Sequence, residues 1–191
     1  MKKYKIIALI GEAGSGKDTL MKRILDKTHM LHEIVSCTTR PPRQGEINGV
    51  NYYFLSPEEF GQRVLDSEML EASCFNDWFY GTGYESLRSD CWNIGVFNPQ
   101  GIDSLLAHPG VEVVVYYVRA SGKQRLIRQL QREDDPDIDE IIRRYKADLI
   151  DFSDLDFMYT DLANETNEDL ENAASYVIRS IQDGSCLLNA R

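Results

Sequence analysis

The chain has 191 residues, which is typical of a single domain at about 100–200 residues per domain. Its 42% hydrophobic and 27% charged residues match a soluble globular protein and exclude a disordered or fibrous one. The formal net charge of −10 argues against a nucleic-acid partner, because a generic DNA or RNA binder needs a net basic face.

The first predicted elements alternate between strand and helix. Tyr4–Ile10 is a continuous apolar run that suits a buried parallel strand, and a glycine-rich turn leads from it into a helix over about 17–27. The Ser-Pro-Glu-Glu segment at 56–59 predicts a second helix start, with a capping serine, a proline at the first helical position and a glutamate at the third. Residues 92–97 and 111–118 are predicted to be further buried strands.

Two helices are expected after these strands. Ser121, with Gln124 three residues later, caps a helix that runs to about Arg132. Asp137 and Glu140 open the next helix. Its predicted apolar face consists of Ile141, Ile142, Tyr145 and Leu149.

The chain closes with one more strand and one more helix. Phe157–Thr160 is the expected short last strand, and Thr166 with Asp169 begins a helix whose apolar residues start at Leu170. Alternating strands and helices predict an α/β fold with a mostly parallel sheet. In such sheets ligands bind at the carboxyl ends of the strands.

Charge is unevenly spread along the chain. Residues 1–50 carry nine basic and five acidic side chains, whereas residues 133–172 carry fifteen acidic and three basic ones. The basic end suits an anionic ligand, and the acidic stretch is interpreted as a solvated helical face.

The glycine-rich segment at 11–19, Gly-Glu-Ala-Gly-Ser-Gly-Lys-Asp-Thr, lies between a strand and a helix, as a phosphate-binding P-loop does. Its glycines let backbone N–H groups turn toward a phosphate, the helix N-terminus adds partial positive charge, and Lys17 adds a full charge. The alternative is a glycine-rich turn with a chance lysine. The expected ATP-binding residues of this segment are Gly11, Glu12, Ala13, Gly14, Ser15, Gly16, Lys17, Asp18 and Thr19.

A second cluster of basic residues lies in the loop at 36–46. Because polyproline II repeats every three residues, Arg40 and Arg43 should project from one side of this proline-containing loop. Two guanidinium groups on one side can clamp a phosphate, and Tyr52 and Tyr80 can add phenolic donors. For an isolated Arg-x-x-Arg, a solvated basic turn is the alternative interpretation.

The order of the motifs resembles that of guanylate kinases. After the P-loop come Ser-Cys-Thr-Thr-Arg-Pro-Pro-Arg-Gln-Gly-Glu-Ile-Asn-Gly-Val-Asn-Tyr-Tyr-Phe at 36–54, Met-Leu-Glu-Ala at 69–72 and Phe-Tyr-Gly-Thr at 79–82. The resemblance is strong over residues 4–101 and looser beyond them. It implies a nucleoside monophosphate kinase that phosphorylates GMP or dGMP with ATP and Mg²⁺.

The resemblance also implies the organisation of the fold. We expect a P-loop NTPase-type, mostly parallel sheet flanked by helices, with a small nucleotide-monophosphate-binding insertion and a helical lid. Residues 1–191 would form one domain, with a core at about 1–35, 92–120 and 145–191, a monophosphate-binding arm at about 36–90 and a lid at about 121–144. The protein would be a monomer or homodimer. The alternatives are a monophosphate kinase of broader specificity and a non-catalytic module that binds phosphopeptides or proteins.

The resemblance assigns the acceptor site residue by residue. Two arginines and two tyrosines would hold the GMP phosphate, and Glu71 would read guanine together with hydroxyl groups. Guanine presents adjacent N1–H and N2–H₂ donors, which suit a carboxylate, and a hydroxyl group can donate to O6. The expected GMP-binding residues are Ser36, Arg40, Arg43, Tyr52, Glu71, Tyr80, Gly81, Thr82 and Asn98.

Phosphoryl transfer requires two phosphates held in line and neutralisation of the charge on the oxygens. The resemblance implies that Lys17, Arg40, Arg132 and Arg144 are catalytic, and that Asn164 borders the adenine of ATP. No general base is needed, because the acceptor phosphate has a second pKa of about 6.

The chain departs from the family pattern at the metal. Guanylate kinases usually carry D-x-D-x-Q-G where residues 96–101 are Val-Phe-Asn-Pro-Gln-Gly, so both aspartates are missing and Asn98 brings only an amide carbonyl. Asp18 stands where a P-loop has the Ser or Thr that ligates Mg²⁺. We hypothesise that Asp18 holds Mg²⁺, directly or through one water; the competing interpretation is a helix cap.

The location is predicted from cysteine usage and from the lack of targeting signals. Cys37, Cys74, Cys91 and Cys186 show neither metal-ligand spacing nor a disulfide framework, which indicates a reducing compartment. The longest apolar run, Ile6–Ile10, is too short to span a bilayer, and no secretory leader is expected. We therefore expect a cytoplasmic protein with no membrane partner.

Overall fold

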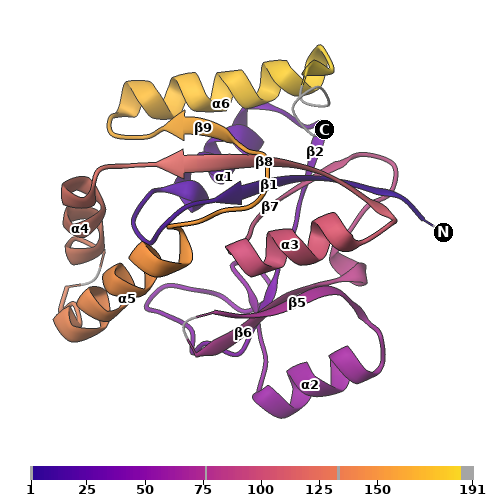
Figure 1. Cartoon of the computed structure of the whole chain (residues 1–191), viewed down its shortest axis with the longest axis horizontal. Coiled ribbons are helices and arrows are strands. Elements are labelled where there is room, and N and C mark those ends of the chain that lie inside the picture. Colours follow the sequence, from indigo (N-terminus) through magenta and orange to yellow (C-terminus); the bar gives the residue numbers. More distant parts are fainter. Residues whose placement is uncertain (1, 76, 133, 186–191) are drawn as a thin grey trace.

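The computed structural model describes residues 2–75, 77–132 and 134–185 (Figure 1). Within them, five strands form the main sheet in the order β2-β7-β1-β8-β9, and every neighbouring pair is parallel. Their bounds are β1 Tyr4–Ile10, β2 Leu31–Glu33, β7 Trp92–Val96, β8 Val111–Arg119 and β9 Thr160–Ala163. The predicted α/β fold with a mostly parallel sheet is confirmed.

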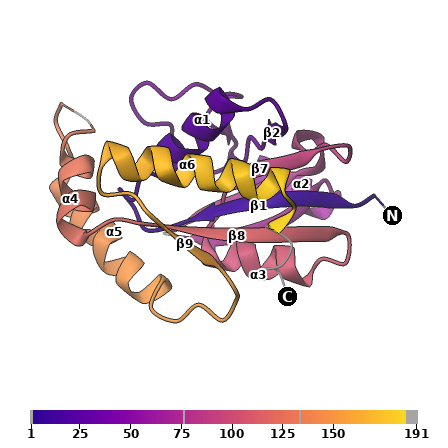
Figure 2. The same cartoon turned by 90° about the horizontal axis from the view of Figure 1, so that it is seen from above.

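Both faces of the main sheet are covered. Successive side chains of β1 point to opposite faces, so Ile7 and Leu9 pack with α1 and α6, whereas Ile6 and Ile10 pack with α3. Figure 2 shows α1 and α6 on one side of the sheet and α3 on the other. Burial on both sides explains the nearly continuous apolar sequence of β1. These helices are α1 Lys17–Lys27, α3 Pro99–Ala107 and α6 Asn167–Gln182.

A smaller sheet lies beside the main one (Figure 1). In the part of the chain that the structure describes it has four strands in the order β4-β3-β6-β5. Helix α3 contacts both β5 and β8 and so connects the two sheets. The elements of this region are β3 Cys37–Thr38, β4 Tyr53–Phe54, α2 Pro57–Leu65, β5 Met69–Phe75, β6 Trp78–Gly83 and the short 3-10 helix η1 Tyr84–Ser86.

Two further helices, α4 Gly122–Leu130 and α5 Ile138–Asp151, pack against each other beyond the carboxyl end of β8. In Figure 1 they lie at the end of the main sheet where β1 leads into the P-loop. They therefore stand at the edge where ligands bind in parallel sheets.

Helix starts follow the local sequence signals. Ser56 and Thr166 each form a complete capping box, and Ser121 and Asp137 each accept a hydrogen bond from the backbone N–H three residues later. At Ser121 the box is completed by the carboxylate of Glu165, which accepts from the Ser121 backbone N–H, and not by the third residue of the helix.

The predicted last strand, Phe157–Thr160, is wrong in its position, because β9 begins at Thr160. A strand must pair with a neighbour, and β8 offers partners to Thr160 through Ala163. Phe157 and Tyr159 join an aromatic cluster with Tyr117 instead. Their apolar character reflects this packing and not a strand.

Two helix predictions also need correction. Helix α4 ends at Leu130, so Arg132 lies beyond it. In α5 only part of the predicted apolar face is buried: Ile141 is buried, but Ile142 and Leu149 are 45% and 56% exposed. The buried face continues through Asp148, seven residues after Ile141, because this face packs against a polar loop.

Across residues 2–75, 77–132 and 134–185, no helix has both the length and the apolar character needed to cross a membrane. Cys37, Cys74 and Cys91 are free thiols. The fourth cysteine, Cys186, lies outside the described residues.

Candidate functional site

The P-loop backbone turns where only glycine fits well. Gly14 and Gly16 have φ of 79° and 89°. A Cβ on Gly14 would lie 2.4 Å from the carbonyl oxygen of Arg125, and one on Gly16 would lie 2.4 Å from Asn164 Nδ2. The P-loop backbone therefore packs closely against α4 and against the segment after β9.

A buried ion pair ties the P-loop to the two helices beyond β8. Arg125 of α4 and Asp148 of α5 are 3% and 1% exposed, with Nη2 and Oδ2 3.1 Å apart. The same Asp148 oxygen accepts from the Ala13 backbone N–H at 2.7 Å, and Arg125 donates to the Ala13 carbonyl and to Glu12. Burial raises the pKa of Asp148. The pair therefore binds both backbone polar groups of one P-loop residue, Ala13.

Arg128 and Asn164 form a second set of hydrogen bonds that stabilises the P-loop. Arg128 donates to the carbonyl oxygens of Ser15 and Asn164, and Asn164 Nδ2 donates to Ser15 at 2.7 Å. The Ser15 side chain is fully buried, and its Oγ finds no partner among the described residues. Asn164, which is expected to border the adenine, thus stabilises the P-loop through its bond to Ser15 and also lines the cavity.

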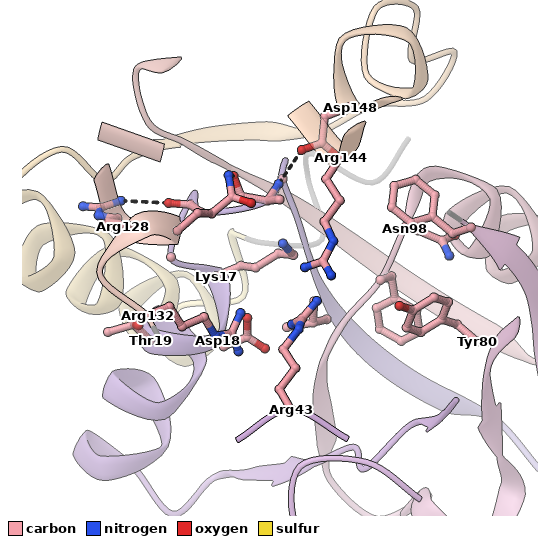
Figure 3. A pocket seen from close by; sticks show the side chains of 18 of the residues that line it. Lys17, Asp18, Thr19, Arg43, Tyr80, Asn98, Arg128, Arg132, Arg144 and Asp148 are labelled. Carbon is pink, nitrogen blue, oxygen red and sulfur yellow. Dashed lines mark hydrogen bonds between the residues drawn. The ribbon is translucent and has the colours of Figure 1, made fainter. Parts of the chain in front are cut away.

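The Lys17 side chain, at the start of α1, points into a cavity of the protein (Figure 3). Its ammonium group lies 3.5 Å from the carbonyl oxygen of Glu12. Burial lowers the pKa of Lys17, and the carboxylates of Asp18 and Asp148 offset part of this effect. An anion in front of Lys17 would complete its charge balance.

One cavity of about 640 Å³ connects the P-loop with the smaller sheet. Figure 3 shows Lys17, Arg43 and Arg144 pointing into it from three different segments, with Tyr80 and Asn98 on the opposite wall. The predicted site residues that line it are Gly11, Ala13, Gly14, Gly16, Lys17, Asp18, Thr19, Ser36, Arg40, Arg43, Tyr52, Glu71, Tyr80, Gly81, Asn98, Arg132, Arg144 and Asn164. Glu12, Ser15 and Thr82 are not part of the lining.

Arginines make one part of the cavity strongly cationic. Burial, followed by the charges of Arg40, Arg144 and Arg132, lowers the pKa of Arg43 to about 10. Guanidinium groups repel one another in this way only where they lie close together. The site therefore suits a multiply charged anion, although the chain as a whole carries a net charge of −10.

Glu46 organises this cluster. Its side chain is 10% exposed, it pairs with Arg40 Nη1 at 3.0 Å, and it accepts from the Arg43 backbone N–H at 2.7 Å. Arg132 reaches it at 3.8 Å from the segment after α4. Although burial acts in the opposite direction, the hydrogen bonds from Arg40 and Arg43 hold the pKa of Glu46 below its ordinary value. Glu46 thus fixes the loop that carries both arginines.

The Arg144 side chain is positioned by Glu140, a residue of the same helix, α5. Glu140 accepts from Arg143 at 2.7 Å and from Arg144 at 2.5 Å, and these bonds, with that from Arg143 the larger influence, lower the pKa of Glu140 to about 2. The Arg144 guanidinium lies 5.9 Å from the ring centre of Trp78 on β6. The Arg144 side chain therefore extends from α5 toward the smaller sheet.

Two aromatic hydroxyl groups flank the arginines. The rings of Tyr52 and Tyr80 lie edge to face with centroids 6.3 Å apart, and Arg40 lies 5.4 Å from the Tyr52 ring centre. Burial raises the pKa of Tyr52, so its hydroxyl group stays neutral and can donate.

The wall formed by the smaller sheet carries a buried carboxylate. Glu71 is 7% exposed, and burial raises its pKa to about 7. Thr82, its register partner on β6, donates from Oγ1 to Glu71 Oε1 at 2.8 Å. Thr82, expected to face a purine base, therefore acts here on Glu71.

Asn98 links this wall to the main sheet. Its Oδ1 accepts from the Gly101 backbone N–H at 2.7 Å and caps α3, while its Nδ2 donates to Ser73 Oγ at 2.9 Å. Asn98 thus spans the gap between β7 and β5.

Sequence reasoning missed the residues that hold the site in shape: Glu46, Ser73, Arg125, Arg128, Glu140 and Asp148. One signal was available, because Asp148 follows the buried Ile141 by seven residues and so shares its helix face. The other members come together from distant segments, and no local pattern marks them.

Known proteins are similar to this chain in sequence and in fold. A family model described as "Guanylate kinase" matches residues 3–183. The guanylate kinase of Nostoc sp. is 32% identical over 146 residues, covering 67% of this chain and 73% of its own length. That of Rubrobacter xylanophilus is 29% identical over 188 residues, covering 96% of this chain and 98% of its own length.

A solved structure shows the likeness of fold. The crystal structure of guanylate kinase from Anaplasma phagocytophilum matches 96% of this chain and 87% of its own, with a TM-score of 0.69 at 20% sequence identity. At this identity the match concerns the fold alone.

Proposed function

The chain belongs to the guanylate kinase family, and from this premise we propose that it transfers the γ-phosphoryl group of ATP to GMP or dGMP. The products are ADP and the guanosine or deoxyguanosine diphosphate. The observation that carries the proposal is that one cavity is lined both by the P-loop and by Arg40, Arg43 and Glu71. Two nucleotides can therefore meet in a single space.

On the donor side, the P-loop binds the ATP phosphates. Backbone N–H groups at the start of α1 and the Lys17 ammonium group neutralise their charge. Because burial lowers the pKa of Lys17, an anion that stabilises its charged form is bound favourably.

On the acceptor side, Arg40 and Arg43 bind the GMP phosphate, with the hydroxyl groups of Tyr52 and Tyr80 as further donors. Burial and, after it, the repulsion from neighbouring arginines lower the pKa of Arg43, and this repulsion is relieved when a dianion enters. The acceptor phosphate is ionised near neutral pH, so it attacks without a general base.

The purine base lies against Glu71, whose free carboxylate oxygen accepts from guanine N1–H. Ser36 supplies a hydroxyl group for O6, and Thr82 keeps Glu71 in position. Adenine has no N1–H and carries an amino group in place of O6, so this wall disfavours it.

The residues present fit a magnesium ion, which the family implies. Among the described residues, no group of three or more His, Cys, Asp or Glu side chains is arranged to hold a metal ion. Nucleotide-bound Mg²⁺ needs only one or two carboxylates besides phosphate oxygens and water. Asp18 is exposed, lines the cavity next to Lys17 and would hold the ion directly or through one water. Mg²⁺ bound there would neutralise charge on the phosphate oxygens.

Two segments are proposed to close over the nucleotides: the arm at about 36–90 and the lid at about 121–144. The arm carries Arg40 and Arg43, and the lid carries Arg132 and Arg144. The ion pair between Arg132 and Glu46 supports this proposal, because it already connects lid to arm. Closure would shield the transferring phosphoryl group from water.

A coupled assay of ADP release tests the function. With ATP and Mg²⁺, GMP and dGMP should be phosphorylated, and AMP, dTMP, UMP and CMP should be turned over at least about 10²-fold less efficiently. Release of ADP with none of the six would contradict the proposal and favour a non-catalytic binding module.

A further inference from the structure

The wall around Glu71 has a particular pattern of hydrogen-bonding groups. Glu71 and Ser73 lie two residues apart on β5 and so share one face of the strand. Asn98 bonds to Ser73 from the neighbouring loop, and all three residues line the cavity. In Figure 3, Asn98 stands on the wall across from Lys17.

One carboxylate oxygen of Glu71 is already engaged by Thr82. Oε1 accepts from Thr82, which is fully buried and is not part of the lining. Oε2 lies 3.3 Å from the position that a Cβ on Gly101 would take, and Gly101 does line the cavity. A purine base therefore meets one acceptor from Glu71.

Asn98 presents a donor beside that acceptor. The Gly101 backbone N–H is a donor, so the amide atom that it contacts must be the oxygen, and this assigns Oδ1. The other amide atom, Nδ2, is then the nitrogen that approaches Ser73. Oδ1 is occupied by the Gly101 N–H and one N–H of Nδ2 by Ser73, so the second N–H of Nδ2 is a donor that a ligand can meet.

This pattern suits the N1–H and 6-oxo groups of a purine better than a 2-amino group. With N1–H on Glu71 and O6 toward Ser36, the 2-position of the base turns toward Asn98 and Ser73. A 2-amino group there meets the Asn98 donor, and its remaining acceptor is the neutral Ser73 hydroxyl group, which already takes one bond. A neutral hydrogen bond adds a factor of only about ten in affinity or less.

We propose that the site also phosphorylates inosine monophosphate, the 6-oxopurine nucleotide that lacks a 2-amino group. The proposal rests on the proposed function and extends it to a second acceptor. A phosphate oxygen of the acceptor forms a bond to the γ-phosphorus, the bond from this phosphorus to the bridging oxygen breaks, and its electron pair stays on ADP. The products are ADP and inosine diphosphate.

The test compares kcat/KM for GMP, inosine monophosphate and AMP at saturating ATP and Mg²⁺, with the diphosphate products separated by anion-exchange chromatography. We expect inosine monophosphate to be within about ten-fold of GMP, and AMP to be at least about 10²-fold lower. Turnover of GMP with inosine monophosphate reduced 100-fold or more would overturn this inference and leave the proposed function intact. Turnover of neither would overturn both.

A variant pair locates the cause. Asn98→Asp keeps an oxygen for the Gly101 N–H, because aspartate is also a good helix cap, and replaces the donor with an acceptor for a 2-amino group. The ratio of GMP to inosine monophosphate efficiency should rise about ten-fold or more. Gln100→Glu is the matched control. The Gln100 side-chain oxygen accepts from the Cys74 backbone N–H, and Gln100 is not part of the cavity lining. The ratio should therefore stay at the wild-type value. An unchanged ratio in Asn98→Asp would overturn the assignment.

Discussion

Glu71 is proposed to bind the purine base, but its buried carboxylate destabilises the folded protein when it is ionised. Its carboxylate is buried with one hydrogen bond from Thr82, so ionisation is unfavourable in the folded chain and the pKa rises to about 7. Because an unfolded glutamate titrates near its ordinary pKa, folding becomes less favourable as the pH rises from about 4.5 to 7. Above that range the penalty stays constant.

Glu71→Gln should therefore have opposite effects on activity and stability. Thr82 keeps the amide oxygen, so the amide nitrogen, a donor, faces guanine N1–H, and kcat/KM for GMP falls about 10²-fold or more. The melting temperature should rise by a few degrees at pH 8 and change little near pH 4.5. Calorimetric scans at the two pH values measure this. An equal difference at both would contradict the linkage to Glu71.

The cationic cluster should act on the acceptor nucleotide. Arg43→Ala removes a charge-assisted contact beside the reacting phosphate, so KM for GMP should rise and kcat should fall about ten-fold or more, while KM for ATP changes little. Arg63→Ala is the control, because Arg63 pairs with Glu85 and is not part of the lining. If guanosine and GMP binding weaken equally in Arg43→Ala, Arg43 is not at the phosphate.

Asp18 can be tested through its metal requirement. The N-cap of α1 is Gly16, without a side-chain hydrogen bond, and Asp18 lies in the first turn, where a carboxylate also interacts favourably with the helix dipole. Asp18→Ala should need about ten-fold more free Mg²⁺ for half-maximal kcat, and Asp18→Ser should recover part of the loss. Identical Mg²⁺ curves for the wild type and Asp18→Ala would leave a role for Asp18 in the local charge balance only.

At the scale of elements, α4 and α5 support the P-loop through Arg125 and Asp148. Removing one partner leaves the other charge buried, which destabilises a protein by about 3–5 kcal/mol. Glu12 still pairs with Arg125 at 3.1 Å, so the loss here should lie at the lower end of that range. Removal of Asp148 also leaves the Ala13 backbone N–H without its acceptor.

We expect Asp148→Ala to raise KM for ATP about ten-fold and to lower the free energy of unfolding, with KM for GMP nearly unchanged. Asp148→Asn should lie between it and the wild type, because an amide oxygen can still accept from Ala13. Asp151→Ala, one turn further along α5 and exposed, is the matched control. Denaturant titration and initial rates measure both effects. Equal rises in KM for both nucleotides would show that the pair does not act through the P-loop.

At the scale of the whole molecule, cationic groups from four segments face one cavity: Lys17, Arg43, Arg132 and Arg144. We expect their repulsion to oppose the proposed closure of the arm and the lid until anions bridge the segments. Small-angle scattering should therefore show a smaller radius of gyration with GMP and a non-hydrolysable ATP analogue together than with either alone. An unchanged radius with both nucleotides would argue against closure of the arm and the lid.

The sequence alone determined the features that depend on neighbours along the chain. The apolar run Tyr4–Ile10, the glycines before Lys17, and the caps at Ser56 and Thr166 each satisfy local backbone and burial requirements, and the elements follow them closely. The motif order at 36–54 and 69–82 predicted the family for the same reason, because each motif is contiguous.

Only the tertiary structure decided the features that depend on partners distant in sequence. The last strand starts at Thr160 because its pairing with β8 begins there, opposite Tyr116. Asp148 is buried because the Ala13 backbone N–H and Arg125 satisfy its charge. Thr82 turns to Glu71 across a strand pair, which no spacing in the chain reveals. A buried polar group is stable only with its partner, and the partner is chosen by the fold.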